Sequence, residues 1–243
     1  MLIRAVSAGR GLQWLSEGFA FFRANPLIWI VNTMLLLVIL SLLSLIPLFG
    51  SIAATLLQPV FAAGLLKACR DLDRGGELRI DHLFDGFREK TKPLLIVGLV
   101  LGLAWIGPFV IWVAATIGSG LFGSALVEAA DWGVGSTSLA PETAMLSMLL
   151  GLSAILLLSV PLAMAGWFAP ALVMFRDIGA GAALKASFVG CLRNMWPFIA
   201  YSVLLLFLII LALIPFGLGL LVLAPVLLGS VYAGYKDVYP DGP

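Results

Sequence analysis

Side chains that could carry chemistry are few and widely spaced in this 243-residue chain. The single histidine, His82, sits in a charged stretch, and the two cysteines, Cys69 and Cys191, are far apart in the sequence. A zinc site needs clustered His, Cys or carboxylate ligands, and a nucleophile triad also lacks parts. We therefore interpret His82 as a solvated loop residue and the cysteines as small apolar fillers. We expect no metal, no cofactor and no catalytic residue.

Carboxylates alternate with basic residues in one stretch of the chain, from about residue 70 to residue 92. Such alternation is typical of a solvated mixed-charge surface and not of a carboxylate pair with tuned acidity. No glycine-rich phosphate-binding motif occurs, so nucleotide and nucleic-acid binding are unsupported. The sequence favours a protein that is not an enzyme. The acidic members of the stretch are Asp71, Asp73, Glu77, Asp81, Asp85 and Glu89.

The elements that position these residues are apolar runs. Hydrophobic residues make up 62% of the chain and charged residues 11%, against roughly 25% charged in soluble domains. We predict an all-α polytopic membrane protein, one integral membrane domain over residues 1–243. Its six spans are expected at about 27–46, 51–66, 93–116, 144–173, 196–214 and 218–235. At 1.5 Å per residue, such helices reach across most of a ~30 Å hydrocarbon core.

The fourteen Lys and Arg residues can all be placed on one side of the membrane. With an even number of spans, the positive-inside rule puts both termini and both basic loops in the cytoplasm. The outer loop, about 117–142, contains no basic residue. The first apolar run is too long for a signal peptide, so we expect a retained first span. No ionisable residue falls within a span core, which argues against an ion-coupled pump. Uncharged polar residues in the spans, such as Asn32 and Gln58, are interpreted as forming hydrogen bonds between helices.

Self-similarity predicts three repeat units, at about 7–74, 78–178 and 180–238. Each unit would comprise an amphipathic pre-span helix, a span, an outer turn and a returning span. Each then ends in a basic residue followed by Asp, as in Arg70-Asp71, and Ile-Pro marks two of the outer turns. Because each unit has two spans, all three would have the same orientation, as parallel pseudo-repeats.

The pre-span helices carry apolar stripes followed by arginine, as in Leu12, Leu15, Phe19 and Phe22 ahead of Arg23. Such a helix suits the membrane interface, and it equally suits a cytoplasmic collar packed on the helix bundle. Both interpretations stay open. The candidate contacts with lipid or a partner are Phe19, Phe22, Arg23, Phe84, Phe87, Arg88, Phe188 and Arg193.

The F-x-x-F-R-x-N-P pattern of Phe19 to Pro26, the Ile-Pro turn and the Arg-Asp exit resemble a family of uncharacterised six-span proteobacterial inner-membrane proteins. More distantly, they are similar to the membrane domain of some bacterial glycerophosphodiester phosphodiesterases. The resemblance implies a bacterial inner-membrane location and a six-helix fold, and it carries no catalytic residues across. The insertion at 117–142 departs from the pattern.

Two functions from different classes fit these features. The first is a non-enzymatic scaffold, assembly partner or envelope-homeostasis factor that meets a protein partner at its cytoplasmic face. The alternative is a protein that binds or transports a lipid or small apolar solute. Membrane lipids are expected partners in both, and the oligomeric state is open.

Overall fold

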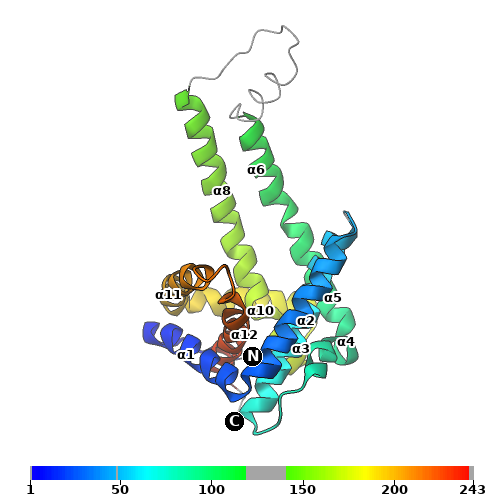
Figure 1. Cartoon of the computed structure of the whole chain (residues 1–243). Coiled ribbons are helices and arrows are strands. Elements are labelled where there is room, and N and C mark those ends of the chain that lie inside the picture. Colours follow the sequence, from blue (N-terminus) through cyan, green and yellow to red (C-terminus); the bar gives the residue numbers. More distant parts are fainter. Residues whose placement is uncertain (1, 48, 119–140, 241–243) are drawn as a thin grey trace. The chain divides into compact units, whose positions relative to one another are not determined.

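The computed structural model describes residues 2–47, 49–118 and 141–240 (Figure 1). The described residues form helices and their connections, with no strand among them. The elements are α1 (Ala8–Ala24), α2 (Pro26–Ser44), α3 (Phe49–Asp73), η1 (Ile80–Phe84), α4 (Asp85–Glu89), α5 (Thr91–Ala104), α6 (Ile106–Gly118), α8 (Pro141–Trp167), α9 (Ala169–Arg176), α10 (Ala180–Arg193), α11 (Met195–Leu213) and α12 (Leu220–Val238).

Within the described residues, six helical stretches are long and apolar enough to cross a membrane. They are Pro26–Ser44, Phe49–Asp73, Thr91–Ala114, Gly151–Arg176, Met195–Leu213 and Leu220–Val238. For the part of the chain that the structure describes, the predicted all-α class with six candidate membrane-spanning helices is therefore confirmed. Their mean hydropathy falls from 2.6 in Thr91–Ala114 to 1.2 in Leu220–Val238, where 56% of the most apolar window is buried. The last helix is therefore the least exposed to its surroundings.

Proline places several of the helix starts. Pro26 opens α2 directly after Asn25, and Pro170 is the second residue of α9. Proline suits the first turn of a helix because the amide hydrogen that it lacks would have no partner there. The indole of Trp29 donates to the carbonyl of Phe21 at 3.0 Å and holds the corner between α1 and α2.

The chain divides into two compact units. The smaller unit, Leu101–Ala163, contains the end of α5, α6 and most of α8. Apolar side chains such as Leu103, Phe109 and Leu157 are exposed on it, as expected for helices that face lipid. Most of the predicted outer loop, residues 119–140, lies outside the described residues.

The larger unit joins Met1–Val100 to Met164–Pro243 and contains the core. Its buried side chains gather where the returning helices end. In α3 the buried residues lie between Pro59 and Cys69, and in α9 they run from Ala169 to Met174. The hairpin tips are exposed, with Phe49 at 74% and Ile214 at 73%. Packing therefore concentrates at one end of each hairpin, and the tips present apolar surface.

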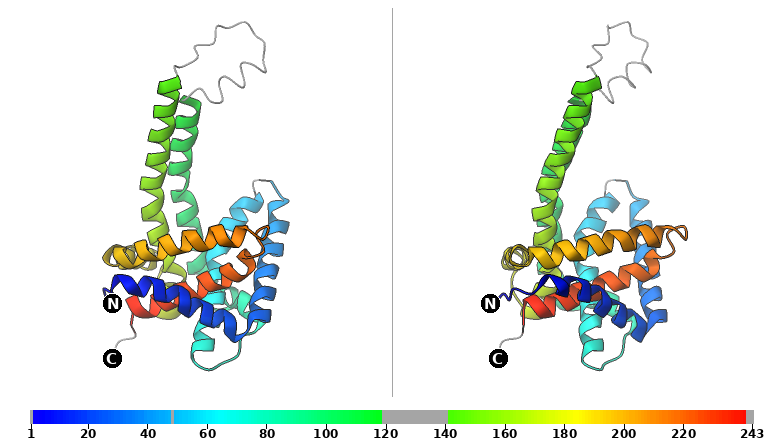
Figure 2. Two further views of the ribbon diagram at one scale, coloured as in Figure 1. Left: turned by 60° about the vertical axis from the view of Figure 1, so that its left-hand side comes forward. Right: turned by 90° about the vertical axis from the view of Figure 1, so that its left-hand side faces the viewer.

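The helices that precede the spans pack on returning helices, and only for α1 is that helix distant in sequence. Helix α1 lies along α11 and α12, η1 and α4 lie on α3, and α10 contacts α9. Within this unit, the hairpin α11–α12 lies across the hairpin α2–α3 (Figure 2). The parallel arrangement of the three repeats therefore stays a prediction.

Candidate functional site

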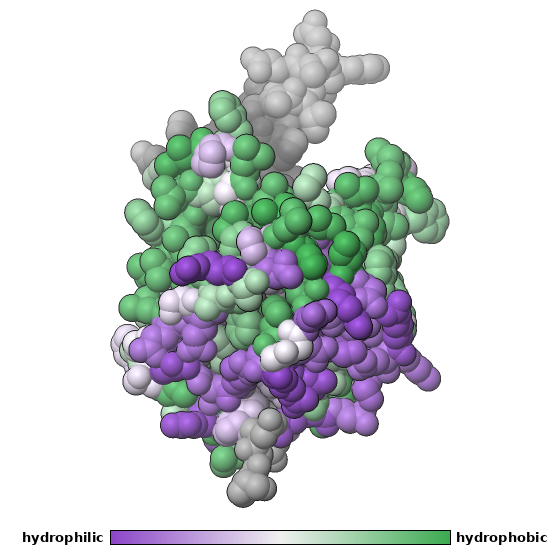
Figure 3. Space-filling model, turned by 60° about the horizontal axis from the view of Figure 1, so that its bottom comes forward, coloured by the Kyte–Doolittle hydropathy of each residue, from purple (hydrophilic) through white to green (hydrophobic). Residues whose placement is uncertain are grey.

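The polar residues of the larger unit gather in what we call the collar. It consists of α1, η1, α4 and α10 together with the last turns of α3, α9 and α12. Figure 3 shows hydrophilic residues concentrated over this end, with apolar surface beyond them. The predicted site residues all belong to the collar's helices or to their ends.

Two of the basic residues that precede Asp at the ends of returning helices reach into the next returning helix. The Arg70 guanidinium of α3 lies 4.4 Å from the centre of the Phe175 ring on α9. Arg176, the residue after Phe175, donates from Nε to the Tyr235 hydroxyl of α12 at 3.0 Å. Its Nη2 also donates to the Tyr239 carbonyl at 2.7 Å, which fastens the end of α12.

The third basic residue closes a cycle. Lys236 of α12 lies 2.8 Å from Asp73 of α3, and the Tyr232 hydroxyl donates to the same carboxylate at 3.1 Å. The contacts thus run from α3 to α9, from α9 to α12 and from α12 to α3. The Asp73–Lys236 pair is about one-third exposed on each side, so it contributes about 1 kcal/mol or less. The cycle therefore fixes geometry more than it adds stability.

The pre-span helices are tied to their neighbours by a second set of polar contacts. Arg10 of α1 lies 2.6 Å from Asp237, which also accepts from the Trp14 indole at 2.7 Å. Burial lowers the pKa of Arg10, but hydrogen bonding and charge from Asp237 and Glu17 outweigh it and raise the pKa. Helix α1 is thereby anchored to the last residues of α12.

The second pre-span segment is anchored through a buried carboxylate. Asp85 is 4% exposed, and Lys67 of α3 reaches it at 2.9 Å. Lys67 also pairs with Glu89. The interpretation of this charged stretch as a solvated surface is therefore wrong at Asp85, because α4 turns that side chain onto α3.

The interpretation of His82 as a solvated loop residue is also wrong. His82 is 2% exposed. Its Nδ1 accepts from the Arg79 amide at 2.9 Å, and its Nε2 faces Asp71 at 3.2 Å. Gly64 permits this burial, because a Cβ there would stand 2.3 Å from the His82 carbonyl oxygen. The histidine holds η1 on α3.

A polar hollow of about 430 Å³ lies beside His82. Its lining offers no Ser, Thr, Cys or Tyr to act as a nucleophile, and both ring nitrogens of His82 are already engaged. Among the described residues, no three His, Cys, Asp or Glu side chains are grouped to hold a metal ion. The residues that line the hollow are Asp71, Arg74, Gly76, Glu77, Arg79 and His82.

The cysteines are buried, as the interpretation of them as apolar fillers requires. Cys69 is 0% exposed and Cys191 is 2% exposed, and both are free thiols. Burial raises the pKa of the Cys191 thiol to about 12, so it is protonated at neutral pH. A protonated, inaccessible thiol is a poor nucleophile and a poor metal ligand.

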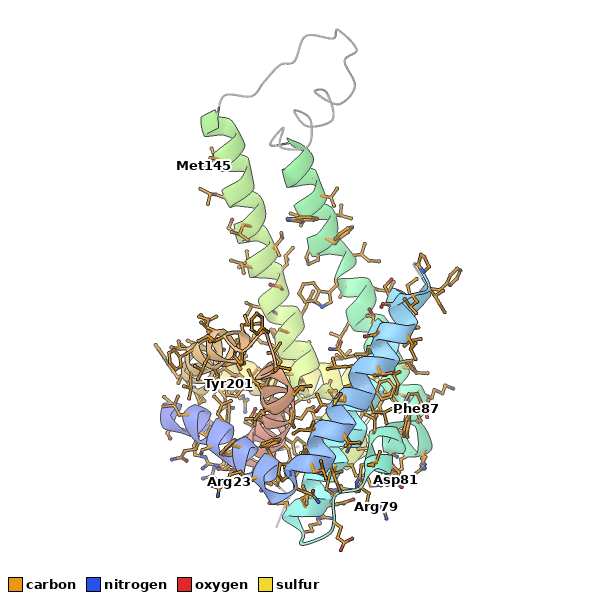
Figure 4. All side chains as sticks on the ribbon, viewed as in Figure 1. Arg23, Arg79, Asp81, Phe87, Met145 and Tyr201 are labelled. Atoms are coloured by element: carbon orange, nitrogen blue, oxygen red, sulfur yellow. The ribbon has the colours of Figure 1, made fainter. Side chains whose placement is uncertain are left out.

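The eight predicted contact residues lie on separate helices and do not converge. Phe19 and Phe84 are exposed by 45% and 36%, whereas Phe22 is 8% exposed and belongs to the core. Phe87 and Phe188 are half-buried, and Arg23, Arg88 and Arg193 are exposed. Figure 4 shows Arg23 and Phe87 on different elements of the collar.

The predicted arginines differ in their partners. Arg88 lies 3.2 Å from Asp81, which Arg79 also approaches at 3.1 Å (Figure 4). The Arg88 hydrogen bond and the nearby basic charges lower the pKa of Asp81. Arg23 and Arg193 form no ion pair with any carboxylate in the described part of the chain. Among the described residues, the exposed Arg4, Arg74, Lys92 and Lys185 likewise have no carboxylate in ion-pair distance.

Sequence reasoning missed the small residues that seat the pre-span helices. A Cβ on Gly18 would stand 2.2 Å from the Val226 carbonyl oxygen, and one on Gly86 would stand 2.1 Å from that of Val60. On α10 the matching small residue is Ser187, which accepts from the Phe168 amide at 2.9 Å. Phe87 therefore corresponds to Phe19, because each follows the glycine at which its helix contacts a returning helix. The signal is a repeated Leu-x-x-small-Phe: LSEGF from Leu15, LFDGF from Leu83 and LKASF from Leu184.

An apolar groove of about 480 Å³ runs between α1 and the hairpin α11–α12. Leu12, Phe19, Leu204, Leu208 and Val222 are among its walls. The groove could not be predicted from local patterns, because its walls come from three helices and α1 precedes α11 by more than 170 residues.

Six apolar helices and a charged collar define a multi-pass membrane protein. Comparison with curated proteins identifies a probable inner membrane protein of Burkholderia thailandensis, 34% identical over 210 residues. The match covers 84% of this chain and 75% of that relative. The chain therefore belongs to the family of this probable inner membrane protein. No family model and no solved structure matches the chain.

Proposed function

We propose that this is a non-enzymatic integral protein of the bacterial inner membrane. It acts through a cytoplasmic collar as a scaffold, assembly partner or envelope-homeostasis factor. The family relative supports the location, and the basic residues, all outside the central parts of the spans, support cytoplasmic termini.

The observation that carries the proposal is the way the collar's polar groups are used. Buried polar residues such as His82, Asp85 and Asn194 bind other parts of the collar and do not converge on a reactive centre. Such a network holds the collar in a fixed shape, and the charged side chains on its outer surface remain accessible to a partner. A preformed surface loses little conformational entropy when a partner binds.

The same proposal includes three repeat units, 7–74, 78–178 and 180–238, whose collar ends follow one another in a ring. Two sets of contacts support it. The cations at the ends of returning helices follow one another in a cycle, from Arg70 to Arg176 to Lys236. Each pre-span helix also packs on the preceding unit's returning helix, with α1 on the last.

The test is purification of the full chain from its own membrane after gentle extraction, followed by native mass spectrometry. The scaffold function predicts a protein subunit at fixed stoichiometry. Replacing Arg23 and Arg193 together with Gln should release that subunit, because these exposed cations lack carboxylate partners within the described chain. A control in which exposed Leu42 and Leu206 become Ala should keep it. A bare monomer from wild-type membranes would refute the scaffold function.

The second candidate is binding or transport of a lipid or small apolar solute. The groove between α1 and α11–α12 is the observation that favours it. The distant resemblance to the membrane domain of glycerophosphodiester phosphodiesterases stays a prediction. It carries no residue roles in this chain.

A further inference from the structure

The groove offers a ligand almost nothing but hydrocarbon. Its lining contains a single polar side chain, Ser16, and the Ser16 hydroxyl already donates to the Gln13 carbonyl at 2.8 Å. An occupant would therefore receive no strong hydrogen bond from the walls. The chemistry of the lining selects an alkyl chain, because burying polar groups there would leave them unsatisfied.

Two close helix contacts keep the groove open between them. At one, α1 crosses α12 where Gly18 lies against Val226. At the other, α11 meets α12 where a Cβ on Gly219 would stand 2.6 Å from the Ala212 Cα. At each of these points the backbones are already in contact, so α1 and α11 cannot move closer to α12 there. The groove volume, about 480 Å³, lies within the ~300–1,000 Å³ typical of small-molecule sites.

A free cation continues the groove along α1. Leu12, Ser16 and Phe19 line it, and Arg23 follows one turn later on the same helical face. Arg23 is exposed and has no carboxylate partner among the described residues. An alkyl slot that continues toward an unpaired guanidinium matches a molecule with a hydrocarbon tail and an anionic head. In a membrane protein, such a molecule is supplied by the bilayer itself.

We propose that the groove between α1, α11 and α12 binds one acyl chain of an anionic phospholipid, whose phosphate contacts Arg23. The site belongs to the second candidate function and names its ligand class. The scaffold function and this site share Arg23, and they are separated by Leu208→Trp, which fills the groove and leaves the cations of the collar in place. Zwitterionic phospholipid would occupy the slot with less preference, because its net charge is zero.

The first test measures bound lipid on the full chain in nanodiscs that contain phosphatidylglycerol and phosphatidylethanolamine. Native mass spectrometry after transfer to detergent should retain phosphatidylglycerol on the wild type. Leu208→Trp, which fills the groove, should lose it, whereas Leu206→Trp on an exposed part of α11 should not. Equal retention by both variants would overturn the acyl-chain site.

The headgroup contact is tested by Arg23→Gln, with Arg193→Gln as the matched control on another pre-span helix. Arg23→Gln should reduce the preference for the anionic lipid by roughly fivefold, the factor that one cation contributes near an anionic membrane surface. Arg193→Gln should leave it unchanged. Equal effects of the two substitutions would mean diffuse attraction to lipid and would overturn the headgroup contact.

A direct measurement needs no groove-filling variant. Phosphatidylglycerol with a photoreactive group in its acyl chain is crosslinked to the wild type, and the modified peptides are identified. The site predicts enrichment at α1 residues 12–19 over the exposed Leu206 and Phe207 of α11. Labelling spread evenly over all exposed apolar residues would overturn the proposal. Absence of any co-purified protein subunit from wild-type membranes, with this labelling pattern unchanged, would refute the scaffold function alone.

Discussion

Gly9 and Gly18 lie on the same helix and should respond in opposite ways to one added methyl group. A Cβ on Gly9 would meet nothing within 4 Å. A Cβ on Gly18 would stand 2.2 Å from the Val226 carbonyl oxygen and 2.7 Å from the Ser230 amide nitrogen. Both obstacles are backbone atoms of α12, which cannot rotate aside as a side chain can. Gly18→Ala must therefore push α1 off α12.

The size of the effect follows from two opposing contributions. Alanine in place of glycine stabilises a helix by up to ~1 kcal/mol, and Gly9→Ala should gain at most this much. Overpacking costs ~1–3 kcal/mol. The shortest contact at Gly18 is about 1.2 Å below the 3.4 Å of ordinary contact, so the upper part of that range applies. We expect Gly18→Ala to lose about 2 kcal/mol net.

Thermal unfolding of the purified variants in one detergent measures the difference. A separation of about 3 kcal/mol corresponds to roughly 6–12 °C in Tm for a chain of this size. Limited proteolysis gives a local measurement. Displacement of α1 should break the Arg10–Asp237 pair and expose residues 8–24 to protease at temperatures where the wild type resists cleavage. If Gly18→Ala is as stable as Gly9→Ala, the Gly18 backbone is not in contact with Val226 and Ser230 of α12.

Four further outcomes are expected. Asp85→Asn should destabilise the protein more than Asp73→Asn in the same unfolding assay, because Asp85 is buried beside Lys67 whereas Asp73 is one-third exposed beside Lys236; equal losses would contradict this ranking. Asn194→Ala should free the N-terminal segment and speed its proteolysis, because Asn194 binds the Val6 amide at 2.8 Å and the Arg4 carbonyl at 3.0 Å, and each buried group left without a partner costs ~1–3 kcal/mol. Neither cysteine should react with maleimide at pH 8 until the protein is denatured, since burial of both thiols, with the pKa of Cys191 raised to about 12, leaves almost no accessible thiolate; rapid labelling of the folded protein would disprove this. Fluorescent-protein fusions at either terminus should fluoresce, and alkaline phosphatase fusions should be inactive, if both termini are cytoplasmic.

The sequence predicted the helices well because apolar length is a local property. A run such as residues 27–46 needs no partner to be recognised as a possible span, and α2 covers nearly the same residues. Helix ends were also readable where proline marks them, as at Pro26. These features depend on the chain within a turn or two, which is the range over which composition and periodicity carry information.

The buried face of α1 was harder to assign. Periodicity joins Leu12, Leu15, Phe19 and Phe22 into one stripe, but Leu12 and Phe19 are exposed and line the groove. The face that packs on α11 and α12 contains Gly11 and Gly18, together with Trp14, Leu15 and Phe22. Glycine adds nothing to a hydrophobic pattern although it determines where two backbones can touch. The predicted apolar stripe was therefore centred to one side of the face of α1 that is actually buried.

The polar contacts of the collar were missed for a related reason. Asp85 and His82 stand among other charged residues, which is the usual composition of a solvated loop. Their burial depends on α3, through Lys67 and the space above Gly64. A partner on another helix cannot be identified from spacing within the loop. The repeated Leu-x-x-small-Phe pattern was the one local sign that these segments are seated on something.

The contacts of α1 have a consequence for assembly. Arg4 donates from its amide to the Val238 carbonyl at 2.9 Å, and Arg10 pairs with Asp237, so the first helix closes against the last. These partners of Arg4 and Arg10 lie more than 200 residues later in the chain, and closing so long a loop is slow. Until then, its Trp14 and Leu15 face lacks a protein partner, and an apolar face beside free cations favours the membrane surface. The interfacial and collar interpretations of this helix are therefore compatible: we expect α1 to rest on the bilayer during synthesis and to pack on α12 once that helix has been made.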